Sequence, residues 1–488
     1  MSGKDVPLLF FNGLASGLDP LSGTVPLYVN FLADAAQAGR MRPGVRPWSE
    51  FGVAPVDSPV IGIYNWRQWT IFVTEDRQIW AWIAPADPAH PGANILALSD
   101  TSDATTLLDG TGRPVFTYDH TRVAIAGGGA PQQWQGSGLS SRLAPGQLNV
   151  DGSPLALTHI AFLALRFFGN DNNNTGQVQW TDDDHTVWPL VGANYMEASS
   201  APDPCVAVYS NTNELFVFGT QTTQVFVPDA VTAVATQAAI QVGCSAPFSI
   251  IDTDGAFAWL DDRHRFVQSS GRKFDVLSTP SIANVIMAPG FVVTDCIAWR
   301  MCIGTWDLLV WLFPTEETGF AYDRVTKKWL NIQSLDENGN FTAWVPRSYF
   351  FWAERNLHLV GLEDGTIGEV TFEATDDNGL PIKAVSRTGF QDRGMFKRKL
   401  CRRAQLQLRR GTTAQPGPAP VVELRYRDDL GAFRPVLRWS MGVAGDYQPI
   451  VDKWNCGVYR QREWELVWSG GGPFVMTGAT ETIEPSET

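Results

Sequence analysis

Apolar residues along this chain fall into short runs separated by turn residues, and the pattern is most regular between residues 248 and 371. Residues 357–362 form one such run, the turn Glu363-Asp364-Gly365-Thr366 follows, and residues 367–370 return. Asp-Gly between β-forming runs is a strong hairpin signal, because tight hairpin turns need residues that tolerate positive φ. Many short strands at regular spacing indicate a sandwich, a barrel or a propeller.

We interpret the pattern as a β-propeller that occupies residues 56–384. Residues 78–83 alternate large apolar residues with small or polar ones, as a half-buried strand does. Long amphipathic stretches are missing, so the predicted fold class is all-β with very little helix. Residues 229–241 could form a helix, but their Val and Thr residues favour strand or loop. Residues 84–112 are rich in Pro, Asp, Ser and Gly and predict a long loop.

The two ends of the chain differ from the middle. Residues 1–55 predict an irregular N-terminal arm, with one short helix from Asn30 to Ala38 that ends at Gly39. Residues 385–480 predict a small C-terminal β-domain, because strand-like runs are separated there by a Gly/Pro-rich loop. Residues 481–488 predict an unstructured acidic tail.

Composition excludes some classes of protein. The chain is 44% hydrophobic and 18% charged, which is too apolar for a disordered chain. The formal net charge is −14, which argues against a general nucleic-acid binder, because phosphate contacts need Lys and Arg. No apolar run reaches the roughly 20 residues of a membrane helix, and the apolar patch at residues 6–11 is too short for a signal peptide. We therefore expect a soluble protein made in a cytoplasm, with no membrane insertion.

The familiar catalytic and cofactor motifs are absent from the sequence. It contains no P-loop, no His-Glu-x-x-His, no Gly-x-Ser-x-Gly and no Cys-x-x-Cys pair. The six His residues are widely scattered. Asp182-Asp183-Asp184-His185 resembles a metal site and Asp252-Thr253-Asp254-Gly255 part of a calcium loop, but a turn explains each better. We predict that the protein is not an enzyme and has no cofactor, metal or catalytic residues.

A basic stretch between Arg393 and Arg410 is the most distinctive electrostatic feature. Residues 403–408 alternate polar and apolar side chains, so one face of a strand would be polar and the other buried. A solvated strand that pairs with acidic neighbours explains the stretch, and so does a surface that faces DNA or an acidic partner subunit. We favour a subunit or partner interface, formed by Arg398, Arg402, Arg403, Arg409 and Arg410.

Several segments together resemble the tail-hub family of short-tailed bacteriophages, also called packaged-DNA stabilisation proteins. Trp180-Thr181-Asp182-Asp183 with Trp188 resembles one strand pair of that family. Gly243-Cys244-Ser245-Ala246-Pro247 resembles its Gly-Cys-x-Ala-Pro element. Tyr322-Asp323 followed by Thr326 and Trp329 is similar to a further hairpin. The resemblance covers residues 175–370 and rests on the order of these motifs, since each is weak alone.

The resemblance implies a structural virion protein of the phage tail that is assembled in the bacterial host cytoplasm. Such hubs form a homo-oligomeric ring, commonly a homohexamer, below the portal and the head-tail adaptor, and tail fibre or needle proteins attach beneath them. They retain packaged double-stranded DNA and form the nozzle for DNA ejection. An acidic channel would let DNA slide without pairing with its phosphates.

The sequence leaves two alternatives open: a glycan-active or glycan-binding β-propeller that acts on a host surface polymer, and a monomeric propeller that binds carbohydrate or protein. Carboxylates that converge on one pocket would support the first alternative. A ring-shaped assembly would support the tail hub.

Overall fold

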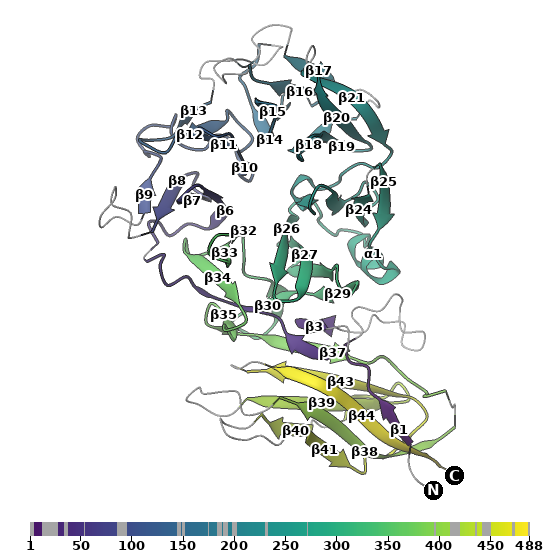
Figure 1. Cartoon of the computed structure of the whole chain (residues 1–488). Coiled ribbons are helices and arrows are strands. Elements are labelled where there is room, and N and C mark those ends of the chain that lie inside the picture. Colours follow the sequence, from purple (N-terminus) through teal and green to yellow (C-terminus); the bar gives the residue numbers. More distant parts are fainter. Residues whose placement is uncertain are drawn as a thin grey trace.

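The computed structural model of the chain is nearly all β-strand (Figure 1). It describes residues 4–11, 28–33, 38–52, 54–84, 95–143, 148, 152–173, 175–182, 188, 194–197, 203–229, 233–270, 272–394, 397–409, 420–434, 437–441, 450–470 and 474–486. Within these ranges the helices are the short α1 (Pro280–Ile286) and the 3-10 turn η1 (Pro247–Ser249). The predicted all-β class with very little helix is confirmed.

Antiparallel sheets stand around a central axis, and the first strand of each lies innermost (Figure 1). Five of them are separate four-stranded sheets. In chain order, the first sheet contains β6 (Val60–Trp66), β7 (Trp69–Thr74), β8 (Ile79–Ile83) and β9 (Ile95–Ala97), and the second contains β10 (Val115–Tyr118), β11 (Val123–Ala126), β12 (Gln132–Trp134) and β13 (Ser141–Arg142). The third contains β14 (Leu157–Leu163), β15 (Arg166–Asp171), β16 (Gln177–Trp180) and β17 (Tyr195–Glu197), and the fourth contains β18 (Cys205–Ser210), β19 (Leu215–Gly219), β20 (Thr223–Asp229) and β21 (Ala233–Ile240). The fifth contains β22 (Ile251–Asp252), β23 (Phe257–Leu260), β24 (Phe266–Ser270) and β25 (Lys273–Val276).

Two further blades belong to larger sheets and complete a seven-bladed propeller within the described residues. One contains β26 (Ile297–Ile303), β27 (Trp306–Phe313), β28 (Thr318–Asp323) and β29 (Lys328–Asn331). The other contains β32 (Ser348–Trp352), β33 (Leu357–Gly361), β34 (Ile367–Thr371) and, on its outside, β5 (Gly44–Pro47). β5 pairs antiparallel with β34, so a strand from the N-terminal arm closes the last blade.

The hairpins follow from local side-chain chemistry, as the β28–β29 turn illustrates. The Asp323 carboxylate accepts hydrogen bonds from the backbone N–H of Val325 at 3.1 Å and of Thr326 at 3.2 Å. Lys327 takes a positive φ of 56°, which brings the chain back. Tyr322 and Trp329 then face each other across the hairpin with ring centroids 5.0 Å apart. These contacts explain the spacing of Tyr-Asp, Thr and Trp in this hairpin.

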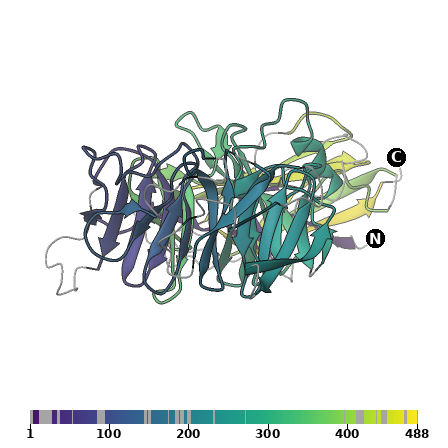
Figure 2. The same cartoon turned by 90° about the horizontal axis from the view of Figure 1, so that it is seen from above.

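A C-terminal β-sandwich lies beside the ring at its rim, and both termini are on it (Figures 1 and 2). One layer contains β37 (Lys383–Arg387), β43 (Arg462–Ser469), β39 (Val421–Asp428) and β40 (Leu437–Ser440). The other contains β3 (Phe31–Ala33), β4 (Gly39–Met41), β44 (Val475–Pro485), β38 (Lys399–Leu408) and β41 (Ile450–Trp454), with β1 (Lys4–Pro7) on β44 and β42 (Val458–Tyr459) on β38. Apolar side chains of both layers, such as Leu406 and Leu466, share one buried cluster.

Backbone pairing joins the sandwich to the propeller. β2 (Tyr28–Val29) pairs in parallel with β29 of a blade and antiparallel with β37 of the sandwich. The blade and one layer of the sandwich therefore form a single nine-stranded sheet. Four short strands complete this region: β30 (Gln333–Leu335), β31 (Phe341–Ala343), β35 (Asp376–Asp377) and β36 (Leu380–Pro381).

The structure corrects the prediction of an irregular N-terminal arm at residues 1–55. The described part of this arm contains β1 to β5, and the helix predicted from Asn30 to Ala38 is wrong because Phe31–Ala33 is a strand. Asn30 has a φ of 59°, and its side-chain amide donates to the backbone carbonyls of Gln333 at 2.8 Å and Lys383 at 2.7 Å. Long-range partners therefore override the local helix signal.

The predicted unstructured tail at residues 481–488 is also wrong as far as the structure describes it. β44 continues to Pro485, and Glu481 is buried in the sandwich.

Residues 85–94 of the predicted loop at 84–112 lie outside the described residues, and β9 follows them. The blades extend from β6 to β34, and β37 already belongs to the sandwich. Among the described residues we find no helix long and apolar enough to cross a membrane.

Candidate functional site

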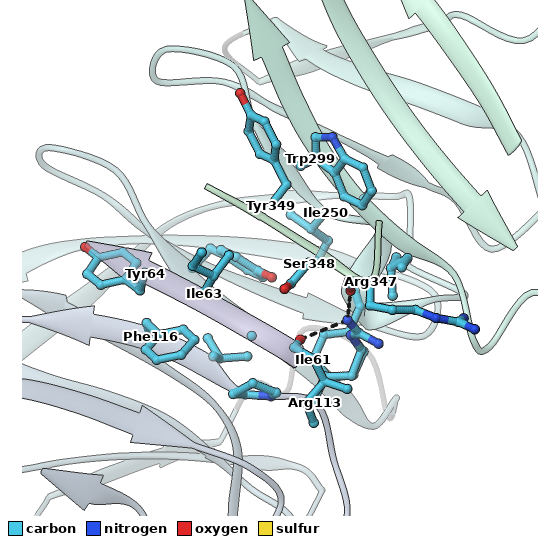
Figure 3. A pocket seen from close by; sticks show the side chains of 17 residues that line it. Ile61, Ile63, Tyr64, Arg113, Phe116, Ile250, Trp299, Arg347, Ser348 and Tyr349 are labelled. Atoms are coloured by element: carbon cyan, nitrogen blue, oxygen red, sulfur yellow. Dashed lines mark hydrogen bonds between the residues drawn. The ribbon is translucent and has the colours of Figure 1, made fainter. Parts of the chain in front are cut away.

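The innermost strands converge on an axial cavity of about 250 Å³ (Figure 3). Large aromatic side chains line it. Tyr64 of β6 stacks on Phe116 of β10 with centroids 5.4 Å apart, and Trp299 of β26 stacks on Tyr349 of β32 at 5.7 Å. Desolvation by burial raises the pKa values of Tyr64 and Tyr349, so their phenols stay neutral. The axis of this propeller is therefore occupied by apolar and aromatic surface.

Arg113 lies at one end of this cavity and connects three blades (Figure 3). Its Nη2 donates to the backbone carbonyl of Ile61, at the start of β6, at 2.9 Å. The same atom donates to the carbonyl of Arg347, just before β32. Burial, and then the positive charge of Arg347, lower the pKa of Arg113 to about 10. Arg113 thus holds the second blade to the two blades that meet where the ring closes.

His159 on β14 is buried near the axis and packs against Phe248, with ring centroids 5.0 Å apart. Burial lowers its pKa to about 3, so the imidazole is neutral. Among the described residues its Nε2 has no hydrogen-bond partner. The part of the chain that the structure describes supplies no carboxylate to orient this ring as a general base, so the ring acts as part of the core.

A second pocket, of about 440 Å³, lies where β6, β10 and β32 end. Tyr118, Phe350 and Trp352 contribute aromatic surface to it, and Asp119 and Glu354 contribute carboxylates. Asp119 Oδ1 accepts from the backbone N–H groups of Thr121 and Arg122 and so stabilises its own turn. This carboxylate therefore has a structural use within the hairpin.

The structure describes four of the five arginines predicted to form an interface; Arg410 lies outside the described residues. Arg402 on β38 binds Glu484 of β44 at 2.9 Å, and Arg403 binds Asp452 of β41 at 2.9 Å. Arg398 and Arg409, at either end of β38, are exposed. The strand pairs with acidic neighbours of its own chain, while the subunit interface stays a prediction.

Two cations of the basic stretch are internal to the sandwich. Arg393 binds the buried Glu481 at 2.6 Å. Lys399 is buried, and its ammonium donates to the carbonyl of Lys397 at 3.0 Å. Burial is the main cause that lowers the pKa of Lys399. Local charge density alone could not separate these structural cations from the exposed ones.

The two acidic motifs set aside as turns have different outcomes. Asp252-Thr253-Asp254-Gly255 is a hairpin turn, because the N–H of Thr253 donates to the carbonyl of Ala256 at 2.8 Å and Gly255 has a φ of 91°. Asp183, Asp184 and His185 lie outside the described residues. Within the part that the structure describes, no group of three or more His, Cys, Asp or Glu side chains could hold a metal ion.

Comparison with known families gives one match, to the family described as the bacteriophage P22 Gp10 β-propeller, over residues 97–270. The predicted resemblance to the phage stabilisation family is confirmed. The match begins in β9 and ends at the last residue of β24, so it covers the blades from β10 to β24. It supports a structural protein of a bacteriophage tail.

Comparison with solved structures gives matches at low sequence identity and low TM-score. The computationally designed Ika8 protein is 10% identical with a TM-score of 0.40, and the match covers 67% of this chain and 99% of that one. The Neurospora crassa Pan2 WD40 domain is 7% identical with a TM-score of 0.41, covering 69% and 96%. A comparison with curated protein sequences finds no match.

The Gly-Cys-x-Ala-Pro element at residues 243–247 has a physical explanation. A Cβ on Gly243 would lie 2.2 Å from the carbonyl oxygen of Thr220, so only glycine fits without a backbone shift. The N–H of Cys244 donates to the carbonyl of Gly219 at 2.9 Å, and Trp259 Nε1 donates to the carbonyl of Gly243 at 2.9 Å. The element therefore connects the blade of β18–β21 to the next one.

Proposed function

We propose that this protein is a tail hub, or nozzle, of a short-tailed bacteriophage. Six copies form a ring below the portal and the head-tail adaptor, retain the packaged double-stranded DNA and surround the channel through which it leaves. Fibre or needle proteins attach below the ring. The observation that carries the proposal is the family match over residues 97–270.

The architecture supports this function. A hub must transmit force between its neighbours without deforming, and here a nine-stranded sheet extends from a blade into the sandwich. The aromatic lining of the propeller axis favours a DNA channel between subunits over one through each propeller. The net charge of −14 suits a channel wall that does not bind phosphates.

We further propose that the protein has no enzymatic activity of its own. The axial cavity combines aromatic surface with one buried guanidinium, a setting that binds or packs but does not transfer protons. The glycan-binding alternative has one supporting observation, the aromatic pocket with its exposed Tyr118. It predicts saturable binding of host surface polysaccharide by the purified chain.

Deletion of the gene from the phage tests the tail-hub function. We expect heads that package DNA and then lose it, so that their DNA becomes sensitive to nuclease, and we expect the wild-type chain supplied in trans to restore retention. Electron microscopy of complemented particles should show a ring below the portal. Particles that lack the protein yet retain DNA and infect normally would contradict the proposal.

A further inference from the structure

Two free cysteines of the C-terminal sandwich lie side by side, although a long segment of chain separates them in the sequence. Cys401 is on β38, and Cys456 is in the turn between β41 and β42. The backbone N–H of Cys456 donates to the carbonyl of Cys401 at 3.0 Å, and the N–H of Cys401 donates to the carbonyl of Gly457 at 2.9 Å. The two cysteines are therefore direct neighbours across paired backbone.

A bulge in the sheet edge turns Cys456 toward Cys401. β38 has two residues between its pairs with β42 and with β41, whereas the edge has three, residues 455–457. Asn455 and Gly457 take φ values of 60° and 83° and are exposed, whereas Cys456 between them is 2% exposed. Bulges at sheet edges redirect side chains in this way. Both cysteines belong to the same buried apolar cluster, so both thiols point into the sandwich core.

The S–H of Cys401 donates to the sulfur of Cys456. This hydrogen bond lowers the pKa of Cys456; burial opposes the shift, and the positive charge of Arg462 adds to it. Arg462 pairs with Asp428, and its Nη2 donates to the carbonyl of Cys456 at 2.7 Å. Its buried Nη1 has no acceptor among the described residues. Cys456 is therefore the sulfur of the pair that ionises first, and a thiolate is the nucleophilic form of cysteine.

The other cysteines differ from this pair. The thiols of Cys205 and Cys244 each donate to a carbonyl two residues further along the chain, and burial raises their pKa values to about 12. Cys302 is exposed, and burial and then the Asp307 carboxylate raise the pKa of its thiol. Cys302 is therefore an accessible thiol without the electrostatic setting of Cys456, which makes it a suitable control.

We propose that Cys401 and Cys456 are an oxidisable dithiol, and that a disulfide between them fastens the β41–β42 edge to β38. The oxidant is a peroxide, which is small enough to reach a turn whose neighbouring residues are exposed. The Cys456 thiolate attacks one peroxide oxygen, the O–O bond breaks and hydroxide leaves. The Cys401 sulfur then attacks the resulting sulfenic acid, the S–O bond breaks and the S–S bond forms. Two thiols and one hydrogen peroxide give one disulfide and two waters, so two electrons pass from sulfur to oxygen.

The disulfide strengthens an edge that is otherwise held to β38 by backbone pairing. β41 is the last strand of its layer as far as the structure describes it. A covalent link across the long segment between the two cysteines restricts the unfolded chain. In the tail-hub setting the thiols stay reduced in the host cytoplasm and are oxidised in the released particle. This setting rests on the proposed function, whereas the chemistry of the pair does not.

Peroxide treatment of the purified, reduced chain tests the pair. Peptide mapping without reductant should show the peptides of Cys401 and Cys456 linked, about 2 Da lighter than the two reduced peptides together. The melting temperature should rise by about 5 °C or more on oxidation. Cys302→Ser removes the exposed thiol and should keep both the link and the rise in melting temperature.

Single variants separate the roles of the two sulfurs. Cys401→Ser should retain a sulfenic acid at Cys456 that dimedone labels, because no second thiol resolves it. Cys456→Ser should leave the buried Cys401 unlabelled under the same treatment. Neither variant should gain melting temperature on oxidation. Circular dichroism checks that each variant is folded, and Ala replaces Ser at a position where Ser prevents folding.

Several outcomes would overturn the dithiol. These are a wild type without the linked peptide, a sulfenic acid on both cysteines without a link, and a link that forms only in urea. Thiol blocking at lysis and in purified particles tests the setting, and we expect free thiols before release and the link afterwards. Free thiols in both samples would overturn the setting and leave the chemistry standing. Linked chains from a phage that retains its DNA without this protein would overturn the hub function and leave the disulfide standing.

Discussion

Arg42 and Asp377, which are 335 residues apart in the chain, form an ion pair in which neither side chain has any exposed surface. Arg42 Nη1 donates to Asp377 Oδ1 at 2.9 Å, and Nη2 donates to the other carboxylate oxygen. Arg42 Nε donates to Asn30 at 2.9 Å, and Ser334 donates to Asp377 at 2.6 Å. The pair thus joins the N-terminal arm to the segment after the last blade.

Arg42→Met should lower the free energy of unfolding by about 3–5 kcal/mol, because it leaves a buried carboxylate without its charge partner. Urea denaturation followed by Trp fluorescence measures this loss. The double variant Arg42→Met, Asp377→Leu should lose less than the sum of the two single changes. Arg46 is a matched control, since its ion pairs with Glu369 and Glu373 are partly exposed and Arg46→Met should cost at most about 1 kcal/mol.

Arg113→Met should weaken the closure of the ring by about 1–3 kcal/mol, because two partly buried backbone carbonyls lose a charged donor. Hydrogen exchange should then accelerate in β6 and β32 before it does so in β18 or β22. Arg67→Ala serves as the control, since Arg67 donates to the carbonyl of His120 at an exposed site. Uniform acceleration in all blades would contradict a local role for Arg113.

His159 should make the protein sensitive to mild acid. Its folded pKa of about 3 lies below the value of about 6.5 in an unfolded chain. Below pH 6.5 the unfolded chain therefore binds a proton that the native state does not, and stability is lost as the pH falls from 6.5 toward 3. His358, whose pKa burial lowers to about 4, acts in the same direction.

His159→Phe tests this sensitivity. Between pH 6.5 and 5 the wild type should lose about 1–2 kcal/mol more stability than the variant, measured by urea unfolding at each pH. His120→Phe, at an exposed position, should keep the wild-type pH dependence. Identical pH profiles for the wild type and His159→Phe would show that folding does not lower the pKa of His159.

Glu481→Ala should destabilise the sandwich by about 3–5 kcal/mol, because the buried carboxylate accepts from three side chains. Its oxygens bind Arg393 at 2.6 Å, Tyr459 at 3.0 Å and Trp464 at 3.2 Å. Glu484→Ala should cost at most about 1 kcal/mol, because its pair with Arg402 is half exposed. Calorimetry of both variants checks the difference, and equal losses would contradict it.

Local chemistry made much of the fold predictable from sequence. The turn Glu363-Asp364-Gly365-Thr366 lies between β33 and β34 as predicted, because Gly365 takes a φ of 77° and Asp364 binds the N–H of Thr366 at 3.0 Å. The β28–β29 hairpin was predictable for the same reason. Such turns depend only on neighbours in the chain.

Features that depend on distant residues were not predictable. Asn30 belongs to no helix because its partners lie some 300 residues away. The sequence predicts that Glu481 belongs to an unstructured acidic tail, because Arg393 and Trp464, which bind it in the sandwich, are far from it in sequence. The charge of the basic stretch was evident, but the division between the internal Lys399 and the exposed Arg409 follows from strand register.

The closure of the last blade by β5 has a consequence for the order in which the chain folds during its synthesis. β5 is translated some three hundred residues before its partner β34, and the separation between β1 and its partner β44 is larger still. Such non-local pairs form slowly, because loop-closure entropy opposes them. The last blade can therefore close only after β34 has been translated, so a chain that terminates before β34 lacks the closed blade.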